Sequence, residues 1–180
     1  MKYTIHAGHA KQGNRFSGAS GIVQESIENR KIKNAVIKYL QQAGQEAADC
    51  TVDSGSSQSA IITAIKKKIN ACDGTAANIS IHLNCFNGKA KGTECEIYPD
   101  SKSAKKMAEN ICDKIASLGF SNRGVKERND LGILKGITNG GINILIEVFF
   151  CDSAEDVKCY HKNGGADTLG KVIAEAILQL

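Results

Sequence analysis

Apolar and polar residues alternate along residues 78–84, which read Asn-Ile-Ser-Ile-His-Leu-Asn. A period of two residues is typical of a β-strand that buries one face. The apolar side chains are therefore expected on one face of this strand, and the polar ones, with His82 near the carboxyl end, on the other. An Asp-Gly pair ending at Gly74 and an Asn-Gly pair ending at Gly88 are typical of turns, so they bound the predicted strand.

The same periodicities predict the other elements. Strands are expected at residues 2–7, 46–52, 93–98, 131–134 and 142–150, and helices at about 22–43, 58–72, 102–118 and 166–180, with a short helix or turn at 152–160. The nearly continuous apolar run at 142–150 is typical of a strand buried on both faces of a parallel sheet. The polar residues 121–126 are predicted to be a loop. Strands that alternate with helices indicate an α/β fold, a single domain with a twisted, mostly parallel sheet of about six strands and helices on both faces.

Composition narrows the class of protein. The length of 180 residues fits one domain with a sizeable core, and a single proline, Pro99, rules out a proline-rich linker. Nothing approaches the ~20 consecutive apolar residues of a membrane span, and the first residues lack the apolar core of a secretory signal. Seven cysteines without a Cys-x-x-Cys pair indicate neither a disulfide framework nor a zinc finger, so synthesis in a reducing cytoplasm is expected.

The charge pattern argues against nucleic acid as a partner. The net charge of +4 favours anionic partners only weakly. The lysine run at 66–68 has no aromatic residue within it, whereas surfaces that bind single-stranded nucleic acid combine charge with aromatic stacking. This run is therefore predicted to be a solvated helix face, and neither nucleic acid nor a membrane is expected as a partner.

Reactive side chains are predicted at the carboxyl ends of three strands. His9 follows the first strand, His82 lies near the end of the central one, and Glu147 interrupts the run at 142–150. Ligands of open α/β sheets bind outside the carboxyl ends of the strands. Glu25 falls on the apolar stripe of the first helix, so its carboxylate is expected on the buried side of the first turn and within reach of the others.

Two histidines and one carboxylate that leave a coordination position open are the donor set of a catalytic zinc site. Zinc lowers the pKa of a bound water to ~7, and a second carboxylate can accept the proton. A carboxylate within an apolar strand, such as Glu147, is expected to have a raised pKa, which suits acid–base chemistry. Spacing alone leaves both Glu25 and Glu147 open as the carboxylate ligand.

Five short motifs occur in an order that resembles one enzyme family. They are Gly8-His9, Glu25, Ser80-Ile81-His82-Leu83-Asn84, Asn122-Arg123-Gly124-Val125-Lys126 and Leu145-Ile146-Glu147-Val148-Phe149-Phe150. Along essentially its full length, the chain resembles the zinc-dependent N-acetylmuramoyl-L-alanine amidases of the type 3 family. That family includes bacterial autolysins and the catalytic domains of phage endolysins.

The resemblance implies a zinc ion held by His9, Glu25 and His82, with Glu147 as the catalytic acid–base. The implied substrate is peptidoglycan, and the implied reaction hydrolyses the amide between the lactyl group of N-acetylmuramic acid and the first L-alanine of the stem peptide. Glu147 would accept the proton of the attacking water and pass it to the departing amine.

Two further residues match recurring family positions near the cleft. Asn84 and Arg123 are expected to contact substrate or to support the site, and a guanidinium suits a carboxylate of the stem peptide. The family usually carries Asp-Pro before the Gly-His pair, where this chain has His6 and Ala7. We predict that His6 neighbours the site and is not a ligand.

The resemblance also sets expectations for the whole chain. Residues 1–180 are expected to be one catalytic amidase domain without a wall-binding domain. The lack of a signal sequence favours a phage lysin, made in the cytoplasm and released to act on the cell wall, over an exported autolysin.

Other functions remain as alternatives. The same four residues could serve another zinc hydrolase, either a peptidase or a deacetylase. The chain could also be a non-catalytic module that binds the cell wall. A flavodoxin-like nucleotide binder is disfavoured because no glycine-rich phosphate loop of the required form follows the first strand.

Overall fold

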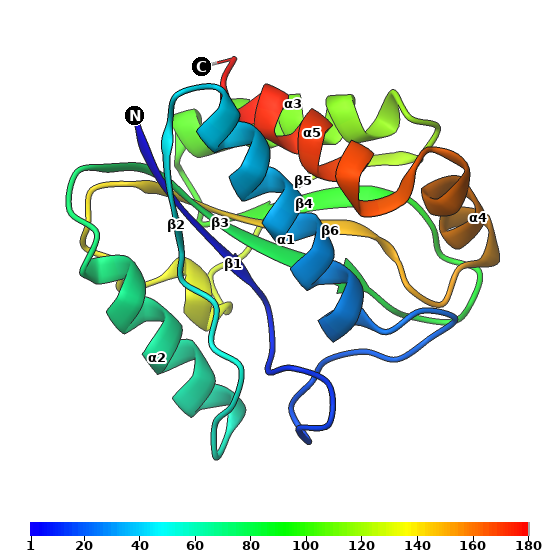
Figure 1. Cartoon of the computed structure of the whole chain (residues 1–180), viewed down its shortest axis with the longest axis horizontal. Helices are drawn as coiled ribbons and strands as arrows, with labels where there is room; N and C mark the ends of the chain where they lie inside the picture. Colours follow the sequence, from blue (N-terminus) through cyan, green and yellow to red (C-terminus); the bar gives the residue numbers. More distant parts are fainter. Residues whose placement is uncertain (180) are drawn as a thin grey trace.

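The computed structural model describes residues 1–179, in which strands alternate with helices (Figure 1). The strands are β1 (Lys2–Ala7), β2 (Glu46–Asp49), β3 (Thr75–Asn84), β4 (Thr93–Ile97), β5 (Asn122–Glu127) and β6 (Ile142–Phe150). The helices are α1 (Glu25–Gln42), α2 (Gln58–Asn70), α3 (Lys102–Ala116), α4 (Ala154–Lys162) and α5 (Gly165–Ile177), with a 3-10 turn η1 (Gly132–Leu134). Within the described residues, every helix is too short or too polar to cross a membrane.

The strands form one six-stranded sheet in the order β2-β1-β3-β6-β4-β5. Neighbouring strands are parallel, except that β4 runs antiparallel to β6. At the centre, β3 and β6 are in a register that sets His82 opposite Glu147. The predicted α/β class, with a single domain and a mostly parallel sheet of six strands, is therefore confirmed.

The two faces of the sheet are covered unequally. Helices α1, α3 and α5 cover one face, on which α1 and α5 lie side by side (Figure 1). The larger core lies beneath them and takes alternate residues of the strands, such as Ile5, Ile79 and Ile146. On the other face, α2 and η1 enclose a smaller core that includes Leu145. Because α2 and η1 cover less of the sheet than the three helices opposite, polar strand residues on this face can reach a cavity.

The predicted division of β3 into an apolar and a polar face is confirmed, and the strand is longer than predicted. Ile79, Ile81 and Leu83 belong to the larger core, whereas Ser80 and His82 line a cavity on the α2 side. The strand begins at Thr75, before the predicted start at 78.

The prediction of a loop at 121–126 is wrong, because Asn122–Glu127 is the edge strand β5. Its residues are exposed or half-buried, so the apolar alternation that reveals other strands is missing. Charged residues are common on edge strands, where they discourage pairing with another chain. The backbone pairing with β4 defines this strand where its side chains do not.

The strand predicted at 131–134 is also wrong, because Gly132–Leu134 forms the 3-10 turn η1. A run of four residues is too short for its periodicity to separate a strand from a helical turn. Ile133 and Leu134 are buried in the smaller core, which explains why the segment is apolar.

The remaining differences concern where elements begin and end. Helix α1 begins at Glu25 and not at 22, since Ser20 and Gln24 form an isolated β-bridge before it. Strand β2 ends at Asp49 and not at 52. The last helix ends at Ile177, and the predicted end at Leu180 lies outside the described residues.

Candidate metal centre and active site

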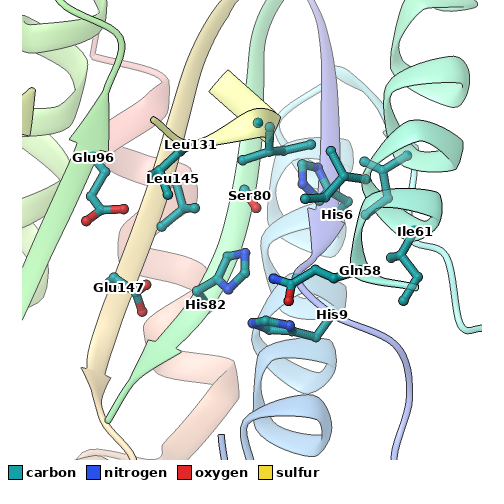
Figure 2. A pocket seen from close by; sticks show the side chains of 15 residues that line it. His6, His9, Gln58, Ile61, Ser80, His82, Glu96, Leu131, Leu145 and Glu147 are labelled. Atoms are coloured by element: carbon teal, nitrogen blue, oxygen red, sulfur yellow. The ribbon is translucent and has the colours of Figure 1, made fainter. Parts of the chain in front are cut away.

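The central strands β3 and β6 carry His82 and Glu147 side by side near their carboxyl ends. The parallel register pairs these two residues directly. Their apolar neighbours Ile81 and Ile146 point into the larger core, so alternation turns His82 and Glu147 toward the α2 side. Both line the cavity on that side (Figure 2).

His9 lies in a turn just after β1. Its φ of 60° is in the left-handed region, which is uncommon for a residue other than glycine. Two side chains of α1 hold this turn: Asn29 donates to the carbonyl oxygen of Gly8 at 3.0 Å, and Arg30 donates to that of His9 at 3.0 Å. The helix that carries Glu25 therefore also fixes the backbone that presents His9.

Glu25 is the first residue of α1, and only 2% of its surface is exposed. Its Oε2 accepts a hydrogen bond from the backbone N–H of Ala19 at 2.8 Å, and its Oε1 accepts one from Leu83 at 3.2 Å. A carboxylate at a helix N-terminus is also stabilised by the helix dipole. These bonds offset part of the cost of burying the charge and hold the carboxylate in one orientation.

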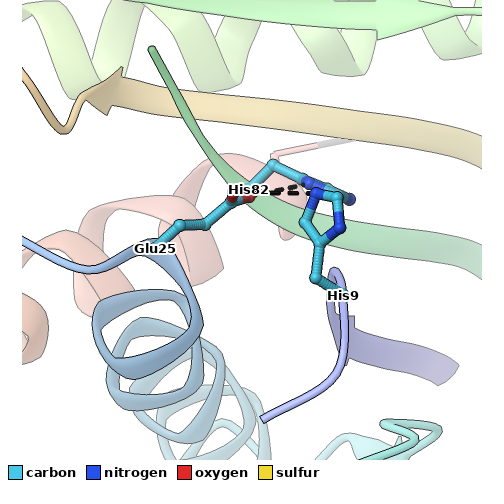
Figure 3. A group of neighbouring side chains, drawn as sticks. All are labelled: His9, Glu25 and His82. Carbon is cyan, nitrogen blue, oxygen red and sulfur yellow. Dashed lines mark hydrogen bonds and ion pairs between the residues drawn. The ribbon is translucent and has the colours of Figure 1, made fainter. Parts of the chain in front are cut away.

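His9, Glu25 and His82 converge on one point (Figure 3). Glu25 Oε1 lies 3.0 Å from His82 Nδ1, and Glu25 Oε2 lies 3.6 Å from His9 Nε2. One ligand atom from each of the three residues lies within 4.8 Å of the others. Tetrahedral zinc with bonds of ~2.0–2.1 Å requires ligand atoms roughly 3.3 Å apart, so the set fits such an ion. The cluster is therefore a possible metal site.

Two glycines allow these side chains to approach the backbone. A Cβ at Gly8 would lie 2.0 Å from the ring of His82, and a Cβ at Gly18 would lie 2.4 Å from Glu25 Oε2. Real Cβ atoms do not approach other atoms this closely. The Gly-His sequence of the first motif thus has a steric reason beyond the flexibility of the turn.

The three residues of the cluster influence one another's pKa values. Burial tends to raise the pKa of Glu25, but the hydrogen bond and charge of His82 outweigh burial and leave this pKa lowered. Burial tends to lower the pKa of His82, but the bond to Glu25 and the charges of Glu25 and Glu147 leave it raised. Burial and the neighbouring His82 lower the pKa of His9. The site therefore favours a carboxylate at Glu25 that attracts positive charge.

Glu147 is not part of the three-residue cluster but faces the same cavity. Burial raises its pKa to about 8, and the negative charge of Glu25 contributes in the same direction against the effect of His82. Its Oε2 is buried without a hydrogen-bond partner. A carboxyl group with a pKa near neutrality and a free oxygen can accept and release a proton.

Asn84 and Arg123 meet on a carboxylate that the sequence patterns did not single out. Asn84 Nδ2 donates to Glu94 Oε1 at 3.1 Å, and Arg123 Nε donates to Glu94 Oε2 at 2.7 Å. The guanidinium of Arg123 also lies 5.0 Å from the centre of the Phe150 ring. Neither Asn84 nor Arg123 lines the cavity beside the cluster.

Other residues around the site were missed in the sequence. Glu94 and Glu96 alternate with apolar residues in β4, which is the signal that could have placed them on the face of Glu147. Glu96 and Gln58 line the cavity, as does His6, which the sequence already predicts to neighbour the site. Asn29 and Arg30 carry no comparable signal, because their role depends on a turn that is distant in sequence.

The chain is similar to known proteins along nearly its whole length. The family model of N-acetylmuramoyl-L-alanine amidase matches residues 4–179. An uncharacterized protein of Clostridium perfringens is 35% identical over 181 residues, which cover 98% of this chain and 51% of that protein. The chain thus spans about half the length of this curated relative.

Solved structures share the fold. The catalytic domain of the CD27L endolysin targeting Clostridia difficile has a TM-score of 0.89 and 29% identity, covering 99% of this chain and 97% of that one. Cwp6 from Clostridium difficile, at 24% identity, has a TM-score of 0.83 and covers 98% of this chain and 29% of that one, which shows the fold alone. Because the family model extends over nearly the whole chain, this protein belongs to the N-acetylmuramoyl-L-alanine amidase family.

Proposed function

We propose that the chain is a zinc-dependent hydrolase that cleaves, in peptidoglycan, the amide between N-acetylmuramic acid and the first L-alanine of the stem peptide. The observation that carries this proposal is the convergence of His9, Glu25 and His82 beside Glu147, which faces the same cavity. Family membership supports the choice of bond. The likeness to an endolysin catalytic domain supports a lysin that acts on the bacterial cell wall.

His9 Nε2, His82 Nδ1 and a carboxylate oxygen of Glu25 are the proposed zinc ligands. Zinc, when bound, supplies a Lewis acid for the scissile carbonyl and acidifies water at the same position. The buried carboxylate of Glu25 is already held by Ala19 and Leu83, so little reorganisation is needed for it to face a cation. The pair of imidazoles and one carboxylate keeps a coordination position free for substrate.

Glu147 is the proposed acid–base. Its carboxylate takes a proton from water at Oε2, the oxygen without a protein partner, and returns that proton to the amine nitrogen of L-alanine as the amide breaks. In the metal-free chain, burial raises the pKa of this carboxyl to about 8, which suits a group that both accepts and releases a proton. Proton transfer of this kind contributes roughly 10²–10⁴-fold to rate.

Asn84 and Arg123 are proposed to support the rim of the site through Glu94. The two bonds to Glu94 fix its carboxylate on the same face of the sheet as Glu147, which lies opposite it in register. The half-exposed guanidinium of Arg123 is also available to a carboxylate of the stem peptide.

Digestion of purified cell walls tests the proposal. The zinc-loaded protein is expected to release new N-terminal L-alanine, to lose activity with a chelator and to regain it when zinc is restored. New reducing sugar ends, a free glucosamine amine or a different new N-terminus would overturn the assignment in favour of another hydrolase. Absence of any cleavage by the zinc-loaded protein would favour a binding module.

A further inference from the structure

A cavity of about 200 Å³ extends from the cluster of His9, Glu25 and His82 into the space between the sheet, helix α2 and the turn η1 (Figure 2). His9, His82 and Glu147 border it on one side. The proposed chemistry does not use its other walls. The cavity is therefore placed to receive the part of the substrate next to the bond that is cut.

Much of the lining of this cavity, contributed by α2, by the segment around η1 and by β6, is aliphatic. This aliphatic lining consists of Ile61, Ile62, Ile65, Leu131, Ile133 and Leu145. Such a lining takes up a small apolar group, because burial releases water from both surfaces. A sugar ring with several hydroxyl groups would leave its polar atoms unpaired there.

The end of the cavity away from His9 is lined by polar side chains that lack hydrogen-bond partners. His6 and Ser80 are paired in the register of β1 and β3, and only 2% of each is exposed. Both ring nitrogens of His6 and the hydroxyl oxygen of Ser80 are buried without a hydrogen-bond partner. Buried polar groups of this kind are normally satisfied, so their presence beside a cavity indicates a polar occupant.

In the described part of the chain, the end of the cavity at His6 and Ser80 offers no cationic side chain to an anion. Glu96 lines the cavity, and no lysine or arginine does so among the described residues. Burial lowers the pKa of His6 to about 3, which keeps its ring neutral at physiological pH. Arg128, which donates a hydrogen bond to Glu96, is also held by Asp130.

We propose that this cavity binds the first two residues of the stem peptide and selects a carboxamide over a carboxylate on the second residue. The inference rests on the proposed amidase function. The methyl group of L-alanine packs on the aliphatic lining. The second residue is a glutamate joined through its side chain, and its α-carboxyl group, free or amidated, reaches His6 and Ser80.

The spacing of His82 and Ser80 along β3 fits this assignment. Ser80 precedes His82 by two residues in β3, so it lies roughly 6.6 Å from His82 along the strand. Two residues of extended peptide span ~6.6–7.2 Å. A dipeptide whose N-terminal amine lies at the cluster of His9, Glu25 and His82 therefore places the α-substituent of its second residue near Ser80 and His6.

Binding can be tested apart from catalysis. The chain, labelled at isoleucine methyl groups, is titrated with L-alanyl-D-isoglutamine and with L-alanyl-D-glutamate, and the NMR shifts are followed. The carboxamide ligand is expected to shift Ile61, Ile62 and Ile133 but not Ile32 and Ile111, which lie on the opposite face of the sheet. The carboxylate ligand is expected to bind at least about tenfold more weakly.

Two variants examine the source of the selectivity. Glu96→Gln removes a negative charge and is expected to reduce the tenfold preference, whereas Glu109→Gln, on the exposed side of α3, should preserve it. Ser80→Ala is expected to weaken binding of the carboxamide ligand severalfold and to leave the carboxylate ligand unchanged. Equal affinities of the two dipeptides, or no shift of the three cavity isoleucines, would overturn the inference.

The outcome is separable from that of the wall digestion. If walls are cleaved at the L-alanine bond but neither dipeptide shifts the cavity isoleucines, the amidase assignment holds and the selective cavity fails. If the dipeptides bind as expected but zinc-loaded protein cleaves no wall, the cavity stands and the catalytic assignment fails.

Discussion

At the scale of single residues, burial shifts the pKa values of side chains at the site. His6 and Glu147 have unpartnered polar atoms. Burial lowers the pKa of His6 and raises that of Glu147, so it favours the neutral form of each side chain. Glu25 is also largely buried, yet its pKa is lowered because the hydrogen bond and charge of His82 and the charge of His9 outweigh burial. Hydrogen-bonded neighbours, and not depth alone, thus distinguish a carboxylate suited to holding a cation from one suited to moving a proton.

Substitution of Glu147 separates proton transfer from metal binding. Glu147→Gln keeps the size of the side chain but removes the base, so turnover of wall fragments should fall by about 10²–10⁴-fold while zinc content stays unchanged. Elemental analysis and released N-terminal alanine provide the two measurements. Glu109→Gln serves as the control, and wild-type turnover in Glu147→Gln would remove this residue from the mechanism.

The lowered pKa of the buried His6 is expected to reduce the free energy of unfolding in acid. Its pKa is about 3 in the folded chain and near 6.5 when unfolded, so the unfolded state binds more protons between these values. Its contribution is complete above pH ~6.5 and is lost as the pH falls toward 3, by at most about 1.4 kcal/mol per pH unit.

Denaturant unfolding of the metal-free protein between pH 7 and pH 4 measures this effect. His6→Leu should show a shallower fall in the free energy of unfolding than the wild type. The exposed His161 on α4 provides the matched control, since His161→Leu should keep the wild-type slope. Identical slopes for His6→Leu and the wild type would contradict the prediction.

At the scale of elements, α1 connects the site to the main core. Its first residue, Glu25, belongs to the possible metal site, Asn29 and Arg30 hold the turn of His9, and its later apolar residues pack in the larger core. Helix α5 lies against it at Gly170, where a Cβ would be 2.2 Å from the Cβ of Ala35. Packing of α1 on α5 therefore helps to fix where Glu25 lies.

Gly170→Ala tests this contact. Alanine would favour the helix by about 1 kcal/mol through its intrinsic propensity. The clash with Ala35 and its backbone should outweigh that gain and lower the free energy of unfolding by roughly 1–3 kcal/mol. Gly132→Ala is the control, because its Cβ would meet Ile62 at an ordinary 3.7 Å. A more stable Gly170→Ala variant in denaturant unfolding would show that α1 and α5 can separate at low cost.

At the scale of the whole molecule, three distant parts of the chain contribute the proposed ligands. The turn after β1, the start of α1 and the end of β3 come together only when the sheet and α1 have formed. An ion bound to the folded state alone stabilises that state by mass action. Metal binding and folding should therefore be coupled.

Thermal unfolding measures this coupling. At a zinc concentration 100 times the dissociation constant, the stabilisation is about 2.7 kcal/mol, which corresponds to a rise in Tm of roughly 5–10 °C. His82→Ala should abolish the zinc-dependent rise, whereas His161→Ala should retain it. A full rise in Tm with zinc in His82→Ala would contradict the ligand assignment.

The sequence predicted most of the molecule where local patterns carry the signal. The alternation in β3, the stripe of α1 that contains Glu25 and the apolar run of β6 each depend on neighbours a few residues apart. Polar β5 and the short turn η1 lack such patterns, so both were misassigned. The family resemblance, and not spacing, distinguished Glu25 from Glu147 in the sequence.

The sequence by itself determined the α/β fold, the family, and the four side chains expected to meet at the carboxyl edge of the sheet. Only the tertiary structure decided that Glu25 joins His9 and His82, that Arg123 is paired with Glu94, and that a cavity with His6 and Ser80 at its end lies beside them. The physical reason is that side-chain distance, burial and charge depend on contacts between segments far apart in the chain, whereas periodicity reports only which face a residue occupies.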